Sequence, residues 1–180
     1  ALKAAAEKFP QLKLTFTDVA EFDITSSTSI DHFLSANNFN YIINCAAYTA
    51  VDKAEEQFDL ALLINAKGPE NLAKACEQRG IKLIHISTDY VFDGNHFLPY
   101  KESDPVSPIG VYGKTKREAE KKLLEIGSHS GMPVTIVRSS LVYGPNMKGN
   151  LQQMLSGIKK GWFPPLPETG NLRSMIHVDD

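Results

Sequence analysis

Tyr112 and Lys116 are the residues whose types and spacing most directly suggest chemistry in this chain. Two side chains four residues apart on a helix share one face, with their Cβ atoms about 5–6 Å apart. A phenol has a pKa of about 10, which is too high for efficient proton exchange near pH 7. An ammonium within about 4–6 Å can lower that pKa by about 1–3 units. We therefore expect Tyr112 to exchange a proton with a substrate while Lys116 tunes it.

A cluster of polar side chains, Ser87-Thr88-Asp89, directly follows an apolar run at 81–86 that is typical of a buried strand. Open α/β sheets bind ligands at the carboxyl ends of parallel strands. The Thr88 hydroxyl can hydrogen-bond a carbonyl oxygen while Tyr112 delivers the proton, as hydride transfer to that carbonyl requires. The alternative is that the three polar residues only begin a loop.

Strand-like and helix-like segments alternate along the chain. An alternation of this kind predicts βαβ units and a parallel sheet. We therefore expect an α/β fold, a Rossmann-like doubly wound sheet, with residues 1–149 as a partial NAD(P)-binding domain and 150–180 as the start of a substrate-binding region. The expected strands are 12–17, 41–45, 82–86, 134–137 and 174–178, and the expected helices are 2–9, 28–36, 52–66, 68–79, 110–126 and 150–159.

The glycine-rich turn that opens a dinucleotide-binding fold has no counterpart in this sequence. All 12 glycines lie at or after Gly68, and the first residue is Ala1 rather than Met. Such a turn lets the backbone approach a pyrophosphate at a helix N-terminus. We expect the chain to be part of a longer protein, without the first strand, the glycine-rich turn and most of a C-terminal substrate domain.

Asp18 is placed to bind the adenosine half of a dinucleotide, because it ends the first expected strand. A carboxylate there can accept hydrogen bonds from ribose hydroxyls, although Asp18 can equally be a turn residue. No Arg or Lys lies between Asp18 and Asp31 to bind a 2′-phosphate, which favours NAD over NADP. Asp23 and Ile24 can flank the adenine, or Asp23 can be a cap or turn residue.

Small residues close the next strand, at Ala46 and Ala47. They would let a cofactor pass close over the strand ends, or would instead allow tight packing of a helix on the strand. Asn65 is expected to brace the neighbouring loop through its amide.

Composition excludes several functional classes. The net charge is −2, which gives no electrostatic basis for binding nucleic acid or an anionic membrane, and no apolar stretch is long enough to span a bilayer. Cys45 and Cys76 fit neither a redox pair nor a zinc site, so we expect no bound metal, reduced thiols and a cytoplasmic location.

Three segments in this order carry a family resemblance: NCAAYTAVDKAE at 44–55, STDYVFDG at 87–94 and YGKTK at 112–116. Together they resemble the extended short-chain dehydrogenase/reductases, and among these the dTDP-4-dehydrorhamnose reductases. The resemblance implies reduction by NADH or NADPH of the 4-keto group of a dTDP-linked 6-deoxyhexose, giving dTDP-L-rhamnose. It also suggests, by analogy, a homodimer formed through long helices such as 110–126.

The resemblance also implies roles for individual residues. Tyr112 would protonate the ketone oxygen, Lys116 would lower the pKa of Tyr112 and bind the nicotinamide ribose, and Thr88 would bind the sugar carbonyl. Asp89 would contact the nucleotide-sugar substrate. The cofactor would be lined by Asp18, Asp23, Ile24, Ala46, Ala47 and Tyr48, together with Tyr112 and Lys116.

The last third of the chain resembles nucleotide-sugar epimerases more closely, through RSSLVYGP at 138–145 and NLRSMIHVDD at 171–180. By that resemblance Asn150 and Arg173 would bind the nucleotide diphosphate, which suits the bidentate fork of a guanidinium.

Two further functions remain open at this stage. An NDP-sugar 4-epimerase would use the same Tyr–Lys pair and retain its NAD, whereas a 4,6-dehydratase is disfavoured because that group resembles Thr-Asp-Glu where this chain has Thr88-Asp89-Tyr90. A non-catalytic regulatory subunit of the reductase-like type would act by association instead.

Overall fold

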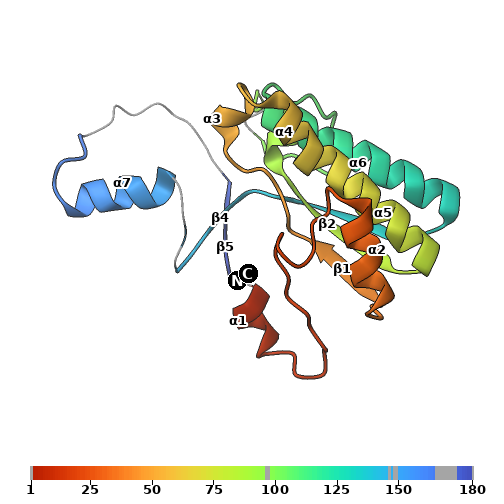
Figure 1. Ribbon diagram of the computed structural model, residues 1–180. Coiled ribbons are helices and arrows are strands. Elements are labelled where there is room, and N and C mark those ends of the chain that lie inside the picture. The colour runs from red at the N-terminus through yellow and green to blue at the C-terminus, as the bar shows by residue number, and fades with distance from the viewer. Residues whose placement is uncertain (1, 96–97, 146, 148–149, 165–173, 180) are drawn as a thin grey trace. The chain divides into compact units, whose positions relative to one another are not determined.

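The computed structural model describes residues 2–95, 98–145, 147, 150–164 and 174–179 (Figure 1). The chain divides into two units, one of residues 13–139 and one of residues 1–12 with 140–180. All the predicted site residues except Asn150 and Arg173 belong to the first unit.

A parallel sheet forms the centre of the first unit. Its strands are β1 (Tyr41–Asn44), β2 (Lys82–Thr88) and β3 (Val134–Ser139), in the order β1-β2-β3. In this register Asn44 lies opposite His85, and Thr88 lies opposite Ser139. The α/β fold with a parallel sheet is therefore confirmed, and β2 runs two residues further than predicted, so that Ser87 and Thr88 end the strand.

Helices flank this sheet, and α5 and α6 pack on β2 (Figure 1). They are α2 (Ser27–Ser35), α3 (Val51–Ala54), α4 (Phe58–Leu62), α5 (Gly68–Arg79) and α6 (Val111–Ser130). Fully burying a Leu or Ile side chain stabilises a fold by about 1.5–3 kcal/mol, so the shared core holds these elements firmly. Its buried members include Ile30, Leu34, Leu72, Cys76, Leu83 and Leu123.

A π-helical segment at Leu63–Lys67 joins α4 to α5, near the break predicted at Gly68-Pro69. Pro69 has no N–H for a helical bond, and the wider π turn closes instead with the Gly68 N–H donating to the Leu63 carbonyl. The segment buries Asn65 completely.

The strand predicted at 12–17 is wrong, because residues 13–17 have no regular secondary structure. A strand needs a hydrogen-bonded neighbour, and no strand of the described residues pairs with this segment. Its alternating side chains Leu12 and Leu14 consequently remain 55% and 44% exposed.

The second unit contains α1 (Leu2–Ala6), β4 (Leu141–Tyr143), α7 (Asn150–Lys159) and β5 (Met175–His177). β4 pairs with β5 in parallel, with Tyr143 opposite His177. The sequence analysis anticipated α7 and β5 but not β4.

Gly113 allows α6 to lie directly against the short 3₁₀ helix η2 (Asp89–Val91). A Cβ atom at Gly113 would overlap the Tyr90 carbonyl oxygen and come within 3.0 Å of Pro108 Cβ. Because the obstacle is backbone, no side-chain rotation relieves it. Gly113 therefore sets how closely Tyr112 approaches Thr88.

We predict that Gly113→Ala lowers the free energy of unfolding by about 1–3 kcal/mol, the usual effect of overpacking. In an unconstrained helix the same change would stabilise by about 1 kcal/mol. Urea denaturation of the full-length protein measures the difference, with Lys121→Ala, at an exposed position of α6, as the control. A stabilised Gly113→Ala variant would contradict the close approach.

Candidate active site

The N-terminus of α6 is held by a carboxylate from α3's C-terminal neighbour, Glu55. The Val111 N–H donates to Glu55 Oε1 at 2.8 Å, which satisfies one of the unpaired amides of the first turn. A negative charge there also opposes the positive end of the helix dipole. Glu55 thus orients the turn that carries Tyr112.

Tyr112 lies at the carboxyl end of β2, where the Thr88 side chain acts to lower the pKa of its hydroxyl. Thr88 Oγ1 also donates to Asp89 Oδ1 at 3.2 Å and accepts from the Tyr90 N–H at 3.2 Å. The Tyr90 ring packs edge-on against that of Tyr112, with centroids 5.5 Å apart. The structure therefore brings Tyr112, Thr88 and Asp89 together, as the sequence predicted.

The pKa of Tyr112 changes in the opposite direction to the one expected. Burial raises the pKa of the Tyr112 hydroxyl, and the nearby Asp89 and Tyr90 raise it further, against a smaller lowering by the Thr88 hydrogen bond. Lys116 is not among the groups that act on Tyr112. Tyr112 consequently stays protonated at neutral pH, as a proton donor must.

Lys116 extends into the interior of the first unit and is only 1% exposed. Its Nζ donates to the Ile86 carbonyl at 2.7 Å and lies 3.2 Å from His85 Nε2. Burial lowers the pKa of Lys116 to about 8, although Glu120 and Cys45 act to raise it. The Lys116 amine therefore loses its charge at a pH only slightly above neutral.

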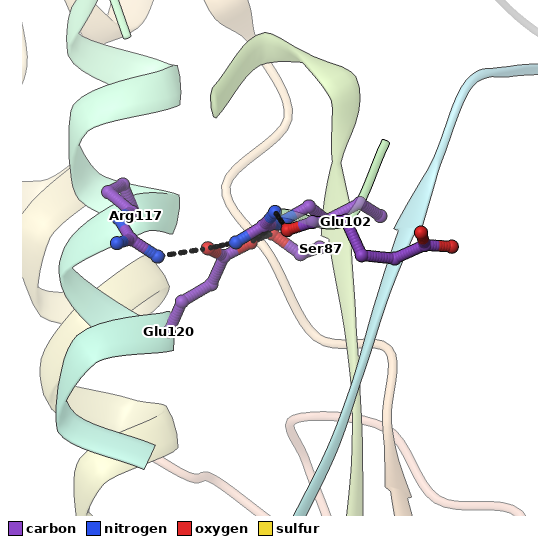
Figure 2. Close-up of polar contacts among 5 residues, drawn as sticks. Ser87, Glu102, Arg117 and Glu120 are labelled. Carbon is purple, nitrogen blue, oxygen red and sulfur yellow. Dashed lines mark hydrogen bonds and ion pairs between the residues drawn. The ribbon is translucent and has the colours of Figure 1, made fainter. Parts of the chain in front are cut away.

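Glu120, one turn beyond Lys116, is the centre of a buried ionic cluster (Figure 2). Its carboxylate accepts from Ser87 Oγ at 2.6 Å and from Arg117 at 2.9 Å. Arg138 of β3 binds it with two nitrogens, Nε at 3.0 Å and NH2 at 2.9 Å. Burial alone would raise the pKa of the Glu120 carboxyl, but the hydrogen bonds from both arginines and the serine outweigh it and hold the pKa below its usual value.

Asn65 braces the loop after β1, as predicted. Its Oδ1 accepts from the Tyr48 N–H at 2.7 Å and its Nδ2 donates to the Tyr48 carbonyl at 3.2 Å. The same Nδ2 reaches Thr115 Oγ1 at 3.1 Å, and Thr115 in turn donates to the Tyr112 carbonyl at 3.0 Å. The loop of Ala46, Ala47 and Tyr48 is therefore tied to the catalytic turn of α6.

The side chains predicted to contact adenosine form turns or lie in the core. Asp18 is exposed, and its Oδ1 accepts from the Ala20 N–H at 2.9 Å, as in a turn. Asp23 Oδ1 accepts from the Thr25 N–H and hydroxyl at 2.9 and 2.8 Å, which also closes a turn. Ile24 is 7% exposed and packs towards Gly68, so its side chain is part of the core.

The small residues after β1 are accessible. Ala46 is exposed and Ala47 half-buried, and the Ala46 N–H donates to Asn44 Oδ1 at 3.0 Å. Asn150 begins α7, and Arg173 lies outside the described residues. Their predicted role in binding a diphosphate stays a prediction.

Three residues of the site were not singled out from the sequence: Glu55, His85 and Glu120. A signal existed for Glu120, since it continues the four-residue spacing of Tyr112 and Lys116 along one helix face. Glu55 lies in a run that carried the family resemblance, but its bond to α6 spans 56 residues of sequence. Nothing in the strand pattern distinguished His85 from an ordinary buried residue.

Several known proteins are similar to this chain in sequence and in fold. A family model described as the RmlD substrate binding domain matches residues 2–161. The chain belongs to this family. Within the part of the RmlD-family chain that the structure describes, no helix is long and apolar enough to cross a membrane, and no group of three metal-binding side chains gathers.

Among curated proteins, the chain is 42% identical over 122 residues to a dTDP-4-dehydrorhamnose reductase of Streptomyces griseus, covering 68% of this chain and 39% of the relative. It is 39% identical over 135 residues to a dTDP-4-keto-6-deoxy-D-glucose reductase of Streptomyces niveus, covering 75% and 46%. The chain thus spans less than half the length of these relatives.

Among solved structures, a dTDP-4-dehydrorhamnose reductase of Clostridium acetobutylicum matches with a TM-score of 0.79 and 40% identity, over 88% of this chain and 54% of that one. The Bacillus anthracis reductase, solved in complex with NADP, matches with a TM-score of 0.78 and 35% identity, over 88% and 56%. A UDP-glucose 4-epimerase of Thermotoga maritima, at 22% identity and a TM-score of 0.78, shares the fold.

We predict that Glu120→Gln lowers the free energy of unfolding by about 1.5–3 kcal/mol at pH 7, because charge-assisted hydrogen bonds to the arginines are lost. The folded-state pKa of Glu120 lies below its ordinary value of 4.5, so its stabilisation is present above that pH and is lost as the pH falls through the folded-state value. The difference between wild type and variant should therefore shrink below about pH 4.5. Denaturant unfolding across pH measures it.

The control for this prediction is Glu56→Gln, at an exposed position. That variant should differ little from wild type at any pH. A Glu120→Gln deficit that does not change in acid would show that the ionised carboxylate is not what stabilises the cluster.

Proposed function

We propose that this chain carries the catalytic residues of an NAD(P)H-dependent reductase that acts on the 4-keto group of a dTDP-linked 6-deoxyhexose, the step that yields dTDP-L-rhamnose. The observation that carries the proposal is that the protonated Tyr112, on α6, and Thr88, at the end of β2, meet at the carboxyl edge of the sheet. The names of the relatives most similar in sequence support the substrate class.

Tyr112 acts as the general acid in this reaction. Its raised pKa keeps the phenol protonated at neutral pH, and the proton passes to the ketone oxygen once developing negative charge has made that oxygen strongly basic. In the structure the single proton of the Thr88 hydroxyl is donated to Asp89 Oδ1. To hold the ketone oxygen, Thr88 turns that proton from Asp89 to the substrate.

A reduced nicotinamide, when bound, supplies the hydride. The residues that would hold it fit this role at the β1 end, where the exposed Ala46 leaves room over the strand. Lys116 keeps one N–H beyond its bonds to Ile86 and His85, enough for one ribose hydroxyl. At the adenosine end the exposed Asp18 is the residue proposed to bind a ribose, while buried Ile24 offers little surface to an adenine.

The choice between NADH and NADPH stays a prediction in favour of NAD, from the absence of Arg and Lys between Asp18 and Asp31. Asn150 and Arg173 as diphosphate ligands and a homodimer through α6 are part of the same proposal. So is a cytoplasmic location, which the two free thiols of Cys45 and Cys76 favour.

We predict that Tyr112→Phe lowers turnover at least a hundredfold, since general acid catalysis contributes about 10²–10⁴. Stability should change little because only a half-buried hydroxyl is removed. Full-length protein would be mixed with dTDP-4-keto-6-deoxymannose and NADH or NADPH, and the absorbance at 340 nm followed. Tyr41→Phe, at the exposed opposite end of the sheet, is the control.

A near-normal rate in Tyr112→Phe would refute its assignment as the acid. Wild-type protein that consumes neither cofactor refutes the reductase. NAD retained through purification would then indicate the epimerase, and a stable complex with another protein, without turnover or cofactor, would indicate the regulatory subunit.

A further inference from the structure

A chain of buried polar groups leads from the end of β1 to Lys116, and catalysis as proposed above does not use it. Asn44 Nδ2 lies 3.1 Å from His85 Nδ1, and His85 Nε2 lies 3.2 Å from Lys116 Nζ. Both His85 and Lys116 are at most 1% exposed, and Asn44 is 4% exposed. With so little water available, each proton in this chain must be directed at an acceptor within it.

The orientation of the Asn44 amide is set by the backbone. The Ala46 N–H donates to Asn44 Oδ1 at 3.0 Å, and only an oxygen can accept this bond. The amide nitrogen of Asn44 therefore faces His85 and donates to its Nδ1. A neutral imidazole that accepts at Nδ1 carries its proton on Nε2.

This tautomer of His85 determines the protonation state of Lys116. The His85 Nε2–H points at Lys116 Nζ, and only a neutral amine has a lone pair to accept it, since an ammonium has none. The neutral amine can still donate to the Ile86 carbonyl at 2.7 Å. Every group in the chain is then satisfied.

When Lys116 is an ammonium, His85 must present the opposite tautomer. Its Nε2 must then accept a hydrogen bond from Lys116, so the ring proton moves to Nδ1. There it meets the amide nitrogen of Asn44, which is also a donor. Asn44 relieves the conflict only by turning its amide over, and the Ala46 N–H then loses its acceptor.

We propose that His85 is a positioning residue for Lys116, whose ring carries its proton on Nε2 when Lys116 is a neutral amine and on Nδ1 when Lys116 is an ammonium. The charge of Lys116 is thereby linked, through His85 and Asn44, to the backbone at Ala46. The catalytic role of Lys116 rests on the function proposed above, whereas the link itself rests only on these contacts.

Other ionisable groups act on Lys116 and His85, but they do not uncouple the charge of Lys116 from the tautomer of His85. Glu120 of α6 and Cys45 after β1 both act on Lys116 and favour its charged form. Burial and the charge of Lys116 lower the pKa of His85 to about 3, so the ring stays neutral wherever Lys116 titrates. The titration of Lys116 therefore appears as an exchange of tautomers and not as a charged ring.

The test is ¹⁵N NMR of the histidine rings in the full-length protein, with His85→Gln used to assign the His85 signals. Spectra would be taken about one and a half pH units above and below the Lys116 pKa of about 8. We expect the protonated nitrogen of His85 to be Nε2 at the higher pH and Nδ1 at the lower. One tautomer at both pH values, or a doubly protonated ring, would overturn the proposal.

Asn44→Asp provides a second test with almost no change in shape. A carboxylate accepts from both the Ala46 N–H and a ring Nδ1–H, so this variant should hold the Nδ1–H tautomer at both pH values. It should also raise the pKa of Lys116 by about one unit or more, as measured from its ε-methylene signals. The control is Asn38→Asp at an exposed position, which adds the same charge and should leave the tautomers unchanged.

A ring that keeps Nε2–H in Asn44→Asp would also overturn the proposal, and if that variant fails to fold, the wild-type pH series decides alone. Turnover is measured separately. An inactive protein with the expected tautomer exchange contradicts the proposed function and leaves the link intact, while an active protein without the exchange does the reverse.

Discussion

The packing of α6 on β2 is the contact on which the rest of the site depends. Tyr112, Lys116 and Glu120 follow one another at four-residue spacing on one helix face. Lys116 is hydrogen-bonded to the Ile86 carbonyl and Glu120 to the Ser87 hydroxyl, both on β2, and Thr88 of β2 acts to lower the pKa of Tyr112. Gly113 permits the close approach, and Glu55 anchors the N-terminal end of the helix, which carries Tyr112.

Burial acts on all three of these side chains with different results, because their partners differ. Glu120 receives hydrogen bonds from two arginines and a serine, and it stays ionised. Lys116 faces a carbonyl and an imidazole, which do not fully replace water, and its pKa falls to about 8. Tyr112 has only a hydroxyl partner and keeps its proton. The site therefore holds a protonated phenol, a weakly basic amine and an ionised carboxylate along one helix.

Much of this could be predicted from the sequence where the signal was local. The periodicity of 110–126 and the apolar run at 81–86 predicted α6 and β2, and the spacing of Tyr112 and Lys116 predicted their shared face. The prediction of a strand at 12–17 was wrong. The residues alternate as in a strand, but a strand also needs a hydrogen-bonded partner from elsewhere in the chain. The prediction of a lowered pKa for Tyr112 was wrong for a related reason, because it took the four-residue spacing to Lys116 as enough to place that ammonium against the phenol.

By itself, the sequence determined which chemistry-bearing residues exist, on which elements they lie and to which family the chain belongs. Helical and strand periods place side chains on faces without reference to the remainder of the chain. Only the tertiary structure decided the protonation states, because these depend on burial and on partners tens of residues away. His85, Asn44 and Arg138 come from three strands, and it is the parallel register that makes them neighbours of Lys116 and Glu120.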